Sequence, residues 1–290
     1  MEKRKASRIV RGQHAVDGAG VHLRRVLGSD TAKDFDPFLM LDGFDSTDPN
    51  DYIKGFPWHP HRGIETITYL VKGLVEHGDS LGNKGIIHDV ECQWMTAGSG
   101  IIHQEMPQVC DRMLGCQLWV NLPAKDKMTT PAYGDITYDK ISMVEADSAI
   151  VRILAGHYKN IHGVFEGKYV NVTYLDVDLA ADALWRYDET PNDETLFIYL
   201  LDGSLAFDEN LSEFEPKSCA VLFSVSDKKA TTNEAIVVKA GRSGARFVLL
   251  AARPLNEPIA WGGPIVMNTF GELKIAMDEL NNGTFIKHEI

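Results

Sequence analysis

The chain has 290 residues, of which 44% are apolar and 24% charged, and its 41 acidic and 29 basic residues give a formal net charge of −12. This composition predicts a globular protein of one large or two ordinary domains. The acidic balance argues against nucleic-acid or anionic-membrane binding as a bulk property and leaves room only for a local basic patch. No secretory signal is expected, because no apolar core follows the basic start of the chain, and no stretch has the ~18 apolar residues of a membrane span.

The first half of the chain has the pattern of short strands. Residues 38–42 predict a buried strand, and residues 65–71 (ETITYLV) predict another because they are rich in β-branched and aromatic side chains. Glycines then divide the following segments, as in a β-meander rather than in helices. Residues 115–122 predict a further strand, and the polar, proline-containing stretch 123–148 is the expected linker.

Two short motifs within this half carry side chains that bind metals. His59 and His61 are separated by one residue, and Glu105 follows His103 at the same interval. In a β-strand, side chains at i and i+2 project to the same face, so each motif forms a two-pronged group of donors. If the two strands meet, burying four such polar groups together is costly unless something satisfies them. The pattern therefore predicts a metal site, with a purely structural cluster as the alternative.

The second half repeats the pattern of the first. Residues 195–203 (TLFIYLLDG) can be laid on residues 65–73 (ETITYLVKG), matching a tyrosine, a leucine and the closing glycine. Counting back without gaps, the two histidine positions correspond to Glu189 and Pro191. A second half with a structural role and no metal ligands is therefore expected.

One helix is predicted, at the end of the chain. Thr269 and Glu272 have the spacing of a capping box, apolar residues follow at helical intervals, and Gly283 stands where a helix would stop. The predicted fold class is therefore all-β with a short C-terminal α-helix.

Several motifs resemble those of the pirins, which belong to the bicupin branch of the cupin superfamily. They extend over nearly the full length, and the two blocks that contain histidine are specific. The matching pieces are DPFL at 36–39, HPHRG at 59–63, QWMTAG at 93–98, GIIH at 100–103, EMP at 105–107, GP at 263–264 and VMNT at 266–269. The resemblance implies two stacked cupin-type β-barrels. We expect a metal-binding N-terminal barrel at residues 1–135, and a C-terminal barrel without metal ligands, ending in the helix, at residues 136–290.

The resemblance also implies a non-haem iron, Fe(II), held by His59, His61, His103 and Glu105. From the residues alone, Zn, Mn, Ni, Co or Cu are alternatives for such donors. Cupins in general take their carboxylate from a position that Glu65 occupies here, so two carboxylates are candidates, and the pirin pattern favours Glu105.

Arg62 directly follows the histidine pair. Two interpretations are open: it pairs with a carboxylate near the metal, Glu65 or Glu91, or it lies at the surface.

The function implied by the resemblance is that of a quercetin 2,3-dioxygenase, an oxidoreductase that cleaves a flavonol, a small aromatic substrate, with O2 and releases CO. Glu105 is then the expected catalytic base, which accepts the proton of the flavonol 3-hydroxyl. The alternative is a metal- or redox-responsive regulatory protein that binds a transcriptional or metabolic partner, which the sequence does not identify. A barrel that is empty or holds zinc, with a stabilising role only, is a third possibility.

The surroundings of the protein follow from its cysteines and charge. Four cysteines are too few for a disulfide scaffold in a chain of this length, so we expect reduced thiols and a cytoplasmic protein, nuclear as well in a eukaryote. We expect neither direct nucleic-acid contact nor a membrane.

Overall fold

The computed structural model describes residues 3–146, 148–227 and 232–287, which divide into two compact units. The first, here called the histidine unit, combines Gln13–Tyr138 with the described chain from Leu255 onward. The second unit combines the described chain up to Gly12 with Asp139–Pro254. The histidine unit, built mainly from the first half of the chain, thus includes the C-terminal segment, and the second unit includes the N-terminal segment.

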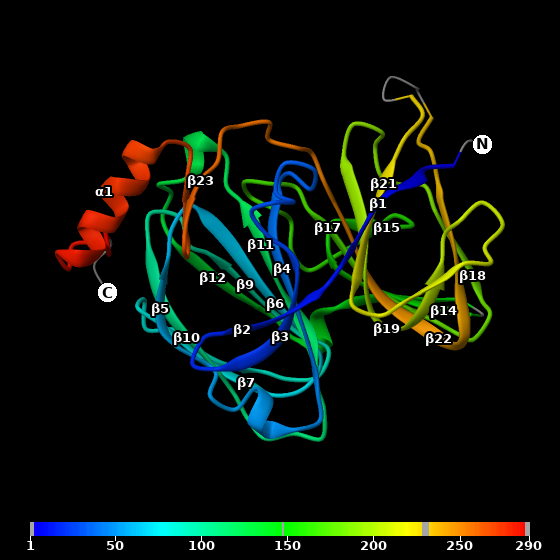
Figure 1. The fold of residues 1–290 in the computed structure, drawn as a ribbon, viewed down its shortest axis with the longest axis horizontal. Coiled ribbons are helices and arrows are strands. Elements are labelled where there is room, and N and C mark those ends of the chain that lie inside the picture. Colours follow the sequence, from blue (N-terminus) through cyan, green and yellow to red (C-terminus); the bar gives the residue numbers. More distant parts are fainter. Residues whose placement is uncertain (1–2, 147, 228–231, 288–290) are drawn as a thin grey trace. The chain divides into compact units, whose positions relative to one another are not determined.

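Strands make up most of both units (Figure 1). The strands of the histidine unit are β2 (Gln13–Asp17), β3 (Val21–Leu27), β4 (Phe38–Ser46), β5 (Phe56–His61), β6 (Ile64–Lys72), β7 (Val75–Asp79), β8 (Lys84–Ile87), β9 (Glu91–Thr96), β10 (Ile101–Pro107), β11 (Met113–Asn121), β12 (Ala132–Ile136), β23 (Ala260–Gly262) and β24 (Ile265–Met267). Those of the second unit are β1 (Lys5–Arg11), β13 (Ser142–Ala146), β14 (Ala149–Ala155), β15 (His157–Tyr158), β16 (Ile161–His162), β17 (Thr173–Leu179), β18 (Leu184–Tyr187), β19 (Thr195–Ala206), β20 (Phe214–Pro216), β21 (Cys219–Ser224) and β22 (Ile236–Ala252). The helical elements are the 3-10 turns η1 (Pro49–Asp51), η2 (Ala124–Asp126) and η3 (Tyr138–Lys140), and the helix α1 (Phe270–Asn281).

Two antiparallel sheets form the body of the histidine unit. The larger has the order β12-β9-β6-β11-β4-β3-β2, and the smaller has the order β5-β10-β7-β8. The central strands β6 and β11 are buried almost throughout, which suits their β-branched and aromatic side chains. Side chains of the two sheets meet in the interior, where Thr68 of β6 donates a hydrogen bond to Glu105 of β10.

The second unit follows the same plan. Its main sheet has the order β1-β21-β19-β22-β17-β14-β13, with β18 on β22 and β20 on β19. Strands β6 and β19 therefore hold the same place in the two orders. These are the strands that the internal repeat of residues 65–73 and 195–203 matches.

The pairing also locates the counterparts of the histidine strands. In the histidine unit, His59 of β5 pairs with His103 of β10, and in the second unit Trp185 of β18 pairs with Val238 of β22. The matching positions are therefore Trp185 and Tyr187, and not Glu189 and Pro191, because the loop before β19 is longer than the one before β6. There the two aromatic rings stack at 5.6 Å with an interplanar angle of 10° and fill the core.

The C-terminal helix forms as its sequence predicts. Thr269 caps α1 in a reciprocal capping box with Glu272, and the helix ends two residues before Gly283. It contacts β23 and β24 of the histidine unit (Figure 1). The helix thus packs on the unit with the histidines, whereas the sequence placed it in residues 136–290. Contacts over such separations leave no trace in local composition.

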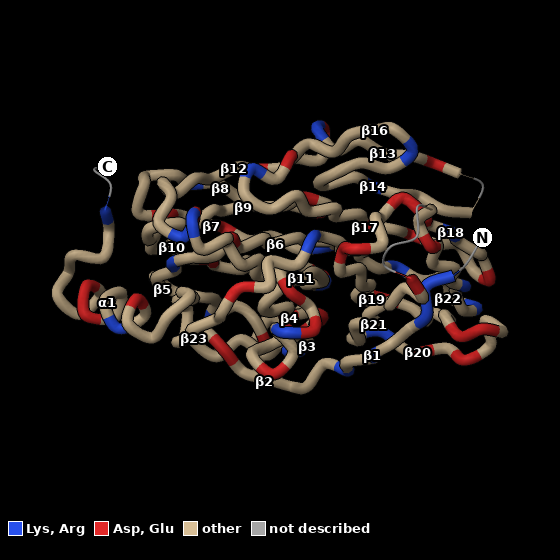
Figure 2. Tube along the Cα trace, turned by 90° about the horizontal axis from the view of Figure 1, so that it is seen from above, with Lys and Arg blue, Asp and Glu red and all other residues tan. Residues whose placement is uncertain are grey.

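The structure also shows the distribution of charges, the character of the helices and the state of the cysteines. Figure 2 shows acidic and basic residues scattered along the strands and loops of both units. Within the described residues, no helix combines the length and the apolar character needed to cross a bilayer. The four cysteines, all in described positions, form no disulfide.

Candidate metal centre

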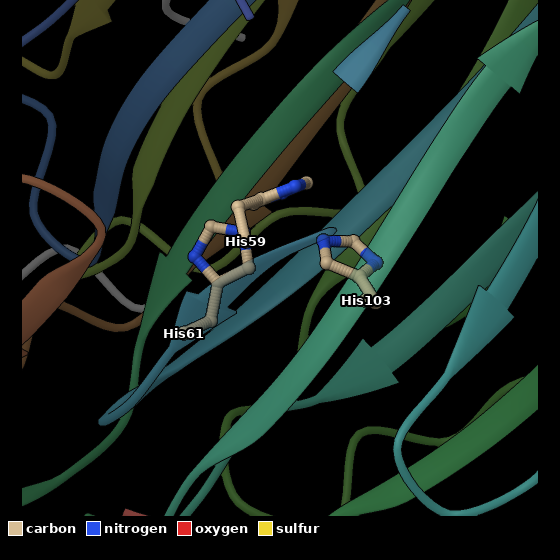
Figure 3. A group of neighbouring side chains, drawn as sticks. All are labelled: His59, His61 and His103. Carbon is tan, nitrogen blue, oxygen red and sulfur yellow. The ribbon is translucent and has the colours of Figure 1, made fainter. Parts of the chain in front are cut away.

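Three histidines from two neighbouring strands meet at one point (Figure 3). His59 and His61 lie on β5, and His103 lies opposite His59 on β10. One nitrogen of each ring lies within 4.8 Å of the other two, and the ring centroids are 4.3 to 5.0 Å apart. Figure 3 shows the three imidazoles gathered between the strands. The three histidines of the two motifs therefore converge.

Glycines shape the turns that flank these strands. Gly63 follows the histidine pair with a φ of +77°, and a Cβ there would lie 2.0 Å from the carbonyl oxygen of Val266. Gly98 precedes β10 with a φ of +50°, and its Cβ would lie 2.2 Å from the carbonyl oxygen of Thr129. Any other residue would be strained and would clash at both positions.

Hydrogen bonds orient two of the rings. The Nδ1 atom of His59 lies 2.9 Å from the carbonyl oxygen of Pro57, and that of His61 lies 3.2 Å from the carbonyl oxygen of Pro264. A carbonyl only accepts, so each Nδ1 carries the proton and each Nε2 keeps a lone pair for a ligand.

The remaining ring nitrogens fit a metal. Within the described chain, Nε2 of His61 and both nitrogens of His103 are buried and have no hydrogen-bond partner. Buried polar atoms are rarely left unsatisfied, and a metal ion coordinated by the three imidazoles would satisfy Nε2 of His61 and one of the two nitrogens of His103. The three histidines can therefore hold a metal ion.

Burial also sets the protonation of the rings. It lowers the pKa of both His61 and His103 well below the usual 6.5, and the neighbouring histidines lower each further. Both imidazoles are therefore neutral near pH 7. Neutral imidazole is the form that binds a metal without first releasing a proton.

The two candidate carboxylates lie in different places. Glu105 follows His103 on the same face of β10, but its oxygens are not among the atoms that meet at the three histidines. Its Oε1 accepts a hydrogen bond from Thr68 at 2.6 Å, and its Oε2 accepts one from Gln117 at 2.8 Å. The carboxylate is thus buried beside the histidines and held by two donors of the larger sheet.

Glu65 lies on the opposite face of the larger sheet. The neighbouring Thr66 pairs with Trp119, whose ring packs edge-on against His61 at 5.0 Å. Successive strand residues face opposite sides, so Glu65 points away from the histidines. There its carboxyl accepts a hydrogen bond from Thr96 at 2.7 Å, and burial raises its pKa despite this bond. Its position argues against Glu65 as a ligand.

A cavity of about 760 Å³ opens beside His59 and His61. One wall holds Trp119 and Trp261, whose rings lie 5.9 Å apart and 36° from parallel. Four charged or polar residues line it as well: Asp17, Arg25, Asp42 and Gln117. The sequence reasoning missed these four residues. The only available signal was a polar residue inside an apolar strand, as at Asp42 in β4 and Gln117 in β11.

Arg62 has neither of the two expected roles. It is 1% exposed and pairs with neither Glu65 nor Glu91. Its Nη1 donates to Glu279 of α1 at 2.7 Å, its Nη2 donates to the Phe285 carbonyl at 2.8 Å, and its guanidinium lies 4.2 Å from the ring centroid of that phenylalanine. This arginine attaches the C-terminal segment next to the histidine strand.

Comparison with known proteins gives consistent matches over the chain. The sequence profile of the Pirin family matches residues 20–120, and that of the pirin C-terminal cupin domain matches residues 174–286. A pirin-like protein of Caulobacter vibrioides is 38% identical over 98% of this chain and 100% of its own length. A Pseudomonas aeruginosa protein provisionally named quercetin 2,3-dioxygenase is 39% identical over 94% of each chain. Among solved structures, quercetin 2,3-dioxygenase of Acinetobacter baumannii superposes with a TM-score of 0.84 at 28% identity, over 98% of both chains.

Proposed function

The chain belongs to the pirin family and has its two cupin domains, and from this premise we propose that it is an Fe(II)-dependent dioxygenase of quercetin 2,3-dioxygenase type. The observation that carries the proposal is the meeting of His59, His61 and His103, two of which have buried, unpartnered nitrogens (His61 and His103) and two of which line a cavity with an aromatic wall (His59 and His61). The names of two similar proteins support the choice of a flavonol as substrate.

The three histidines would hold the metal, and Glu105 would be the fourth ligand. For that, its carboxylate would exchange the hydrogen bonds from Thr68 and Gln117 for the metal. Fe(II) would supply a redox-active centre at which a flavonol and O2 can react, and Zn, Mn, Ni, Co or Cu could occupy the same donors.

The cavity residues would bind and orient the substrate. Trp119 and Trp261 offer a flat surface on which a planar ring system can stack, which suits a flavonol.

Glu105 would act as the catalytic base. Its carboxylate lies on the same strand as His103 and is buried, so that it could take the proton of the flavonol 3-hydroxyl when released from Thr68 and Gln117. Between turnovers, Thr68 and Gln117 would again donate hydrogen bonds to the carboxylate and keep it within the site.

A comparison of two isosteric variants tests the proposal. Iron-loaded Glu105→Gln is expected to consume quercetin at least ~100-fold more slowly than the wild type, because general-base catalysis contributes that much. Glu65→Gln, on the other face of the strand, is the matched control and should keep its rate within about threefold. Quercetin loss is followed by absorbance, with iron content measured in each sample. Equal rates for Glu105→Gln and the wild type would refute the role of Glu105 as the catalytic base. Absence of turnover in iron-loaded wild type would favour the regulatory binding protein.

A further inference from the structure

Three charged residues form a cluster in the wall of the cavity. Arg25 of β3 donates two hydrogen bonds to Asp42 of β4, from Nε to Oδ1 at 3.0 Å and from Nη2 to Oδ2 at 2.7 Å. The same Nη2 donates to Oδ2 of Asp17 at 2.7 Å. We call Asp17, Arg25 and Asp42 the charged cluster. All three line the cavity beside the histidines.

The sheet register builds this cluster into the fold. Arg25 and Asp42 are direct partners on neighbouring strands, and Asp42 is in turn the partner of Gln117, which binds Glu105. The side chain of Asp42 is only 3% exposed. Its partner Arg25 is 38% exposed, so the pair lies between the interior and the cavity, and a partly buried ion pair of this kind adds little stability.

The charge of the cluster selects the kind of group that it can bind. Two carboxylates face one guanidinium, which leaves the wall with an excess of one negative charge. Each carboxylate oxygen that accepts one hydrogen bond can still accept another. The cluster is therefore suited to hydroxyl donors and repels carboxylate or sulfate groups.

A second feature connects the cavity with the candidate metal centre. The buried Nε2 of His61 has no partner among the described residues, and this histidine lines the same cavity. The two tryptophans provide the flat wall. The cavity therefore combines a metal-type nitrogen, an aromatic surface and a group of hydroxyl acceptors.

We propose that the charged cluster is the specificity element of the site. It accepts hydrogen bonds from phenolic hydroxyl groups of a planar aromatic ligand that stacks on Trp119 and Trp261. The proposal rests on the proposed function for its choice of a flavonol as ligand. Asp42 is the main acceptor, Asp17 is a second one, and Arg25 holds both carboxylates in position.

Binding of three flavonols tests the proposal apart from turnover. Quercetin has two hydroxyls on its pendant ring, kaempferol has one and galangin has none, while the flavonol core is the same. Zinc-loaded protein is used because zinc has no redox chemistry, and the Kd is measured by quenching of tryptophan fluorescence. We expect quercetin to bind about tenfold more tightly than galangin, as for a hydrogen bond to a charged group. In Asp42→Asn this ratio should fall to about twofold.

A matched control comes from the same strand. Asp45 of β4 makes a similar two-pronged pair with Arg112, at 2.8 and 3.1 Å, away from the cavity lining. Asp45→Asn should keep the wild-type ratio. Asp17→Asn, at a side chain that is 50% exposed, should lower the ratio by about threefold, and it decides alone if Asp42→Asn does not fold.

The outcomes separate this proposal from the proposed function. A wild-type protein that binds the three flavonols equally, or not at all, overturns the charged cluster as specificity element. So do Asp17 and Asp42 variants that keep the wild-type ratio. A hydroxyl preference that depends on Asp42, together with no quercetin consumption by the iron-loaded protein, would support the cluster and refute the dioxygenase.

Discussion

The ring of His61 is oriented by a residue 203 positions later in the sequence, since its Nδ1 lies 3.2 Å from the carbonyl oxygen of Pro264. Pro264 lies between β23 and β24, at the start of the segment that ends in α1. The C-terminal segment is therefore part of the metal centre, because a ligand's other nitrogen sets its orientation and basicity.

Removing Arg62 should loosen this segment. We expect Arg62→Ala to lower the free energy of unfolding by about 2–4 kcal/mol, because a large buried side chain is lost, the carbonyl of Phe285 loses its donor, and Glu279 is left with Lys287. It should also weaken metal binding about tenfold through the contact between Pro264 and His61. Urea unfolding and metal titration measure the two effects.

The control for this variant is Arg253→Ala. Arg253 pairs with Asp193 at 3.0 Å, but both side chains are exposed, so the loss should stay within about 0.5 kcal/mol. If Arg62→Ala were no more destabilising than this control, the proposed anchoring role of Arg62 would be wrong.

Metal binding should depend on each of the three histidines. His103→Ala is expected to abolish stoichiometric binding of Fe(II) or Zn(II) in calorimetric titration, since it removes one of the three donors that meet. In the wild type, metal at about 100 times its Kd should add about 2.7 kcal/mol of stability. His22→Ala, at a histidine that pairs with Asp51 outside the group, should bind like the wild type. Equal binding by the His103 and His22 variants would contradict the site.

The metal-free protein should lose stability in acid. The pKa values of His61 and His103 in the folded protein lie well below the usual 6.5. As the pH falls below 6.5, the unfolded chain takes up protons there that the folded chain does not, so the free energy of unfolding decreases. A His61→Gln, His103→Gln double variant lacks both groups and should show a shallower decrease between about pH 6.5 and 5, measured by urea unfolding with a chelator present. Parallel curves would contradict the buried, neutral state of these rings.

Lys127 should make the free energy of unfolding depend on pH above neutrality. Its Nζ is buried and donates to the carbonyls of Gly63 and Val266 and to Asn121, at 2.6 to 2.9 Å. Burial lowers its pKa from 10.5 to about 7. Above about pH 7 the unfolded chain keeps a proton that the folded chain loses, so Lys127 makes stability rise toward pH 10.5.

Lys127→Met therefore has a pH-dependent cost. It should destabilise the metal-free protein by about 1–3 kcal/mol at neutral pH, because three acceptors lose their donor. The deficit relative to the wild type should grow as the pH is raised. Chemical unfolding at about pH 7 and pH 9 measures it, and a deficit that is the same at both pH values would show that Lys127 keeps its proton.

The sequence allowed the strands, the terminal helix and the pair of metal-type motifs to be predicted, because each depends on local spacing. Residues 65–71 carry a strand signal of their own, and the capping box of Thr269 lies within one turn of helix. The resemblance to pirins and the bicupin fold class are confirmed by matches over both halves. The ligand role of Glu105 stays a prediction.

Long-range pairing was beyond the reach of these local patterns. Strand β1, at the start of the chain, pairs with β21 of the second unit, and α1, at the end of the chain, packs on the histidine unit. Local composition carries no sign of either contact. Likewise, the partners of Glu105, Thr68 and Gln117, come from two other strands. Their roles depend on sheet register, which a single sequence does not specify at such separations.

Oxygen consumption by Fe(II)-loaded protein with quercetin tests the central claim most directly. The protein is loaded without oxygen, and O2 uptake, loss of quercetin and release of CO are measured together, with His103→Ala as the control. We predict uptake coupled to both changes in the wild type and none in the control. Iron bound at the three histidines without O2 uptake, or uptake that persists in His103→Ala, would contradict the proposed dioxygenase.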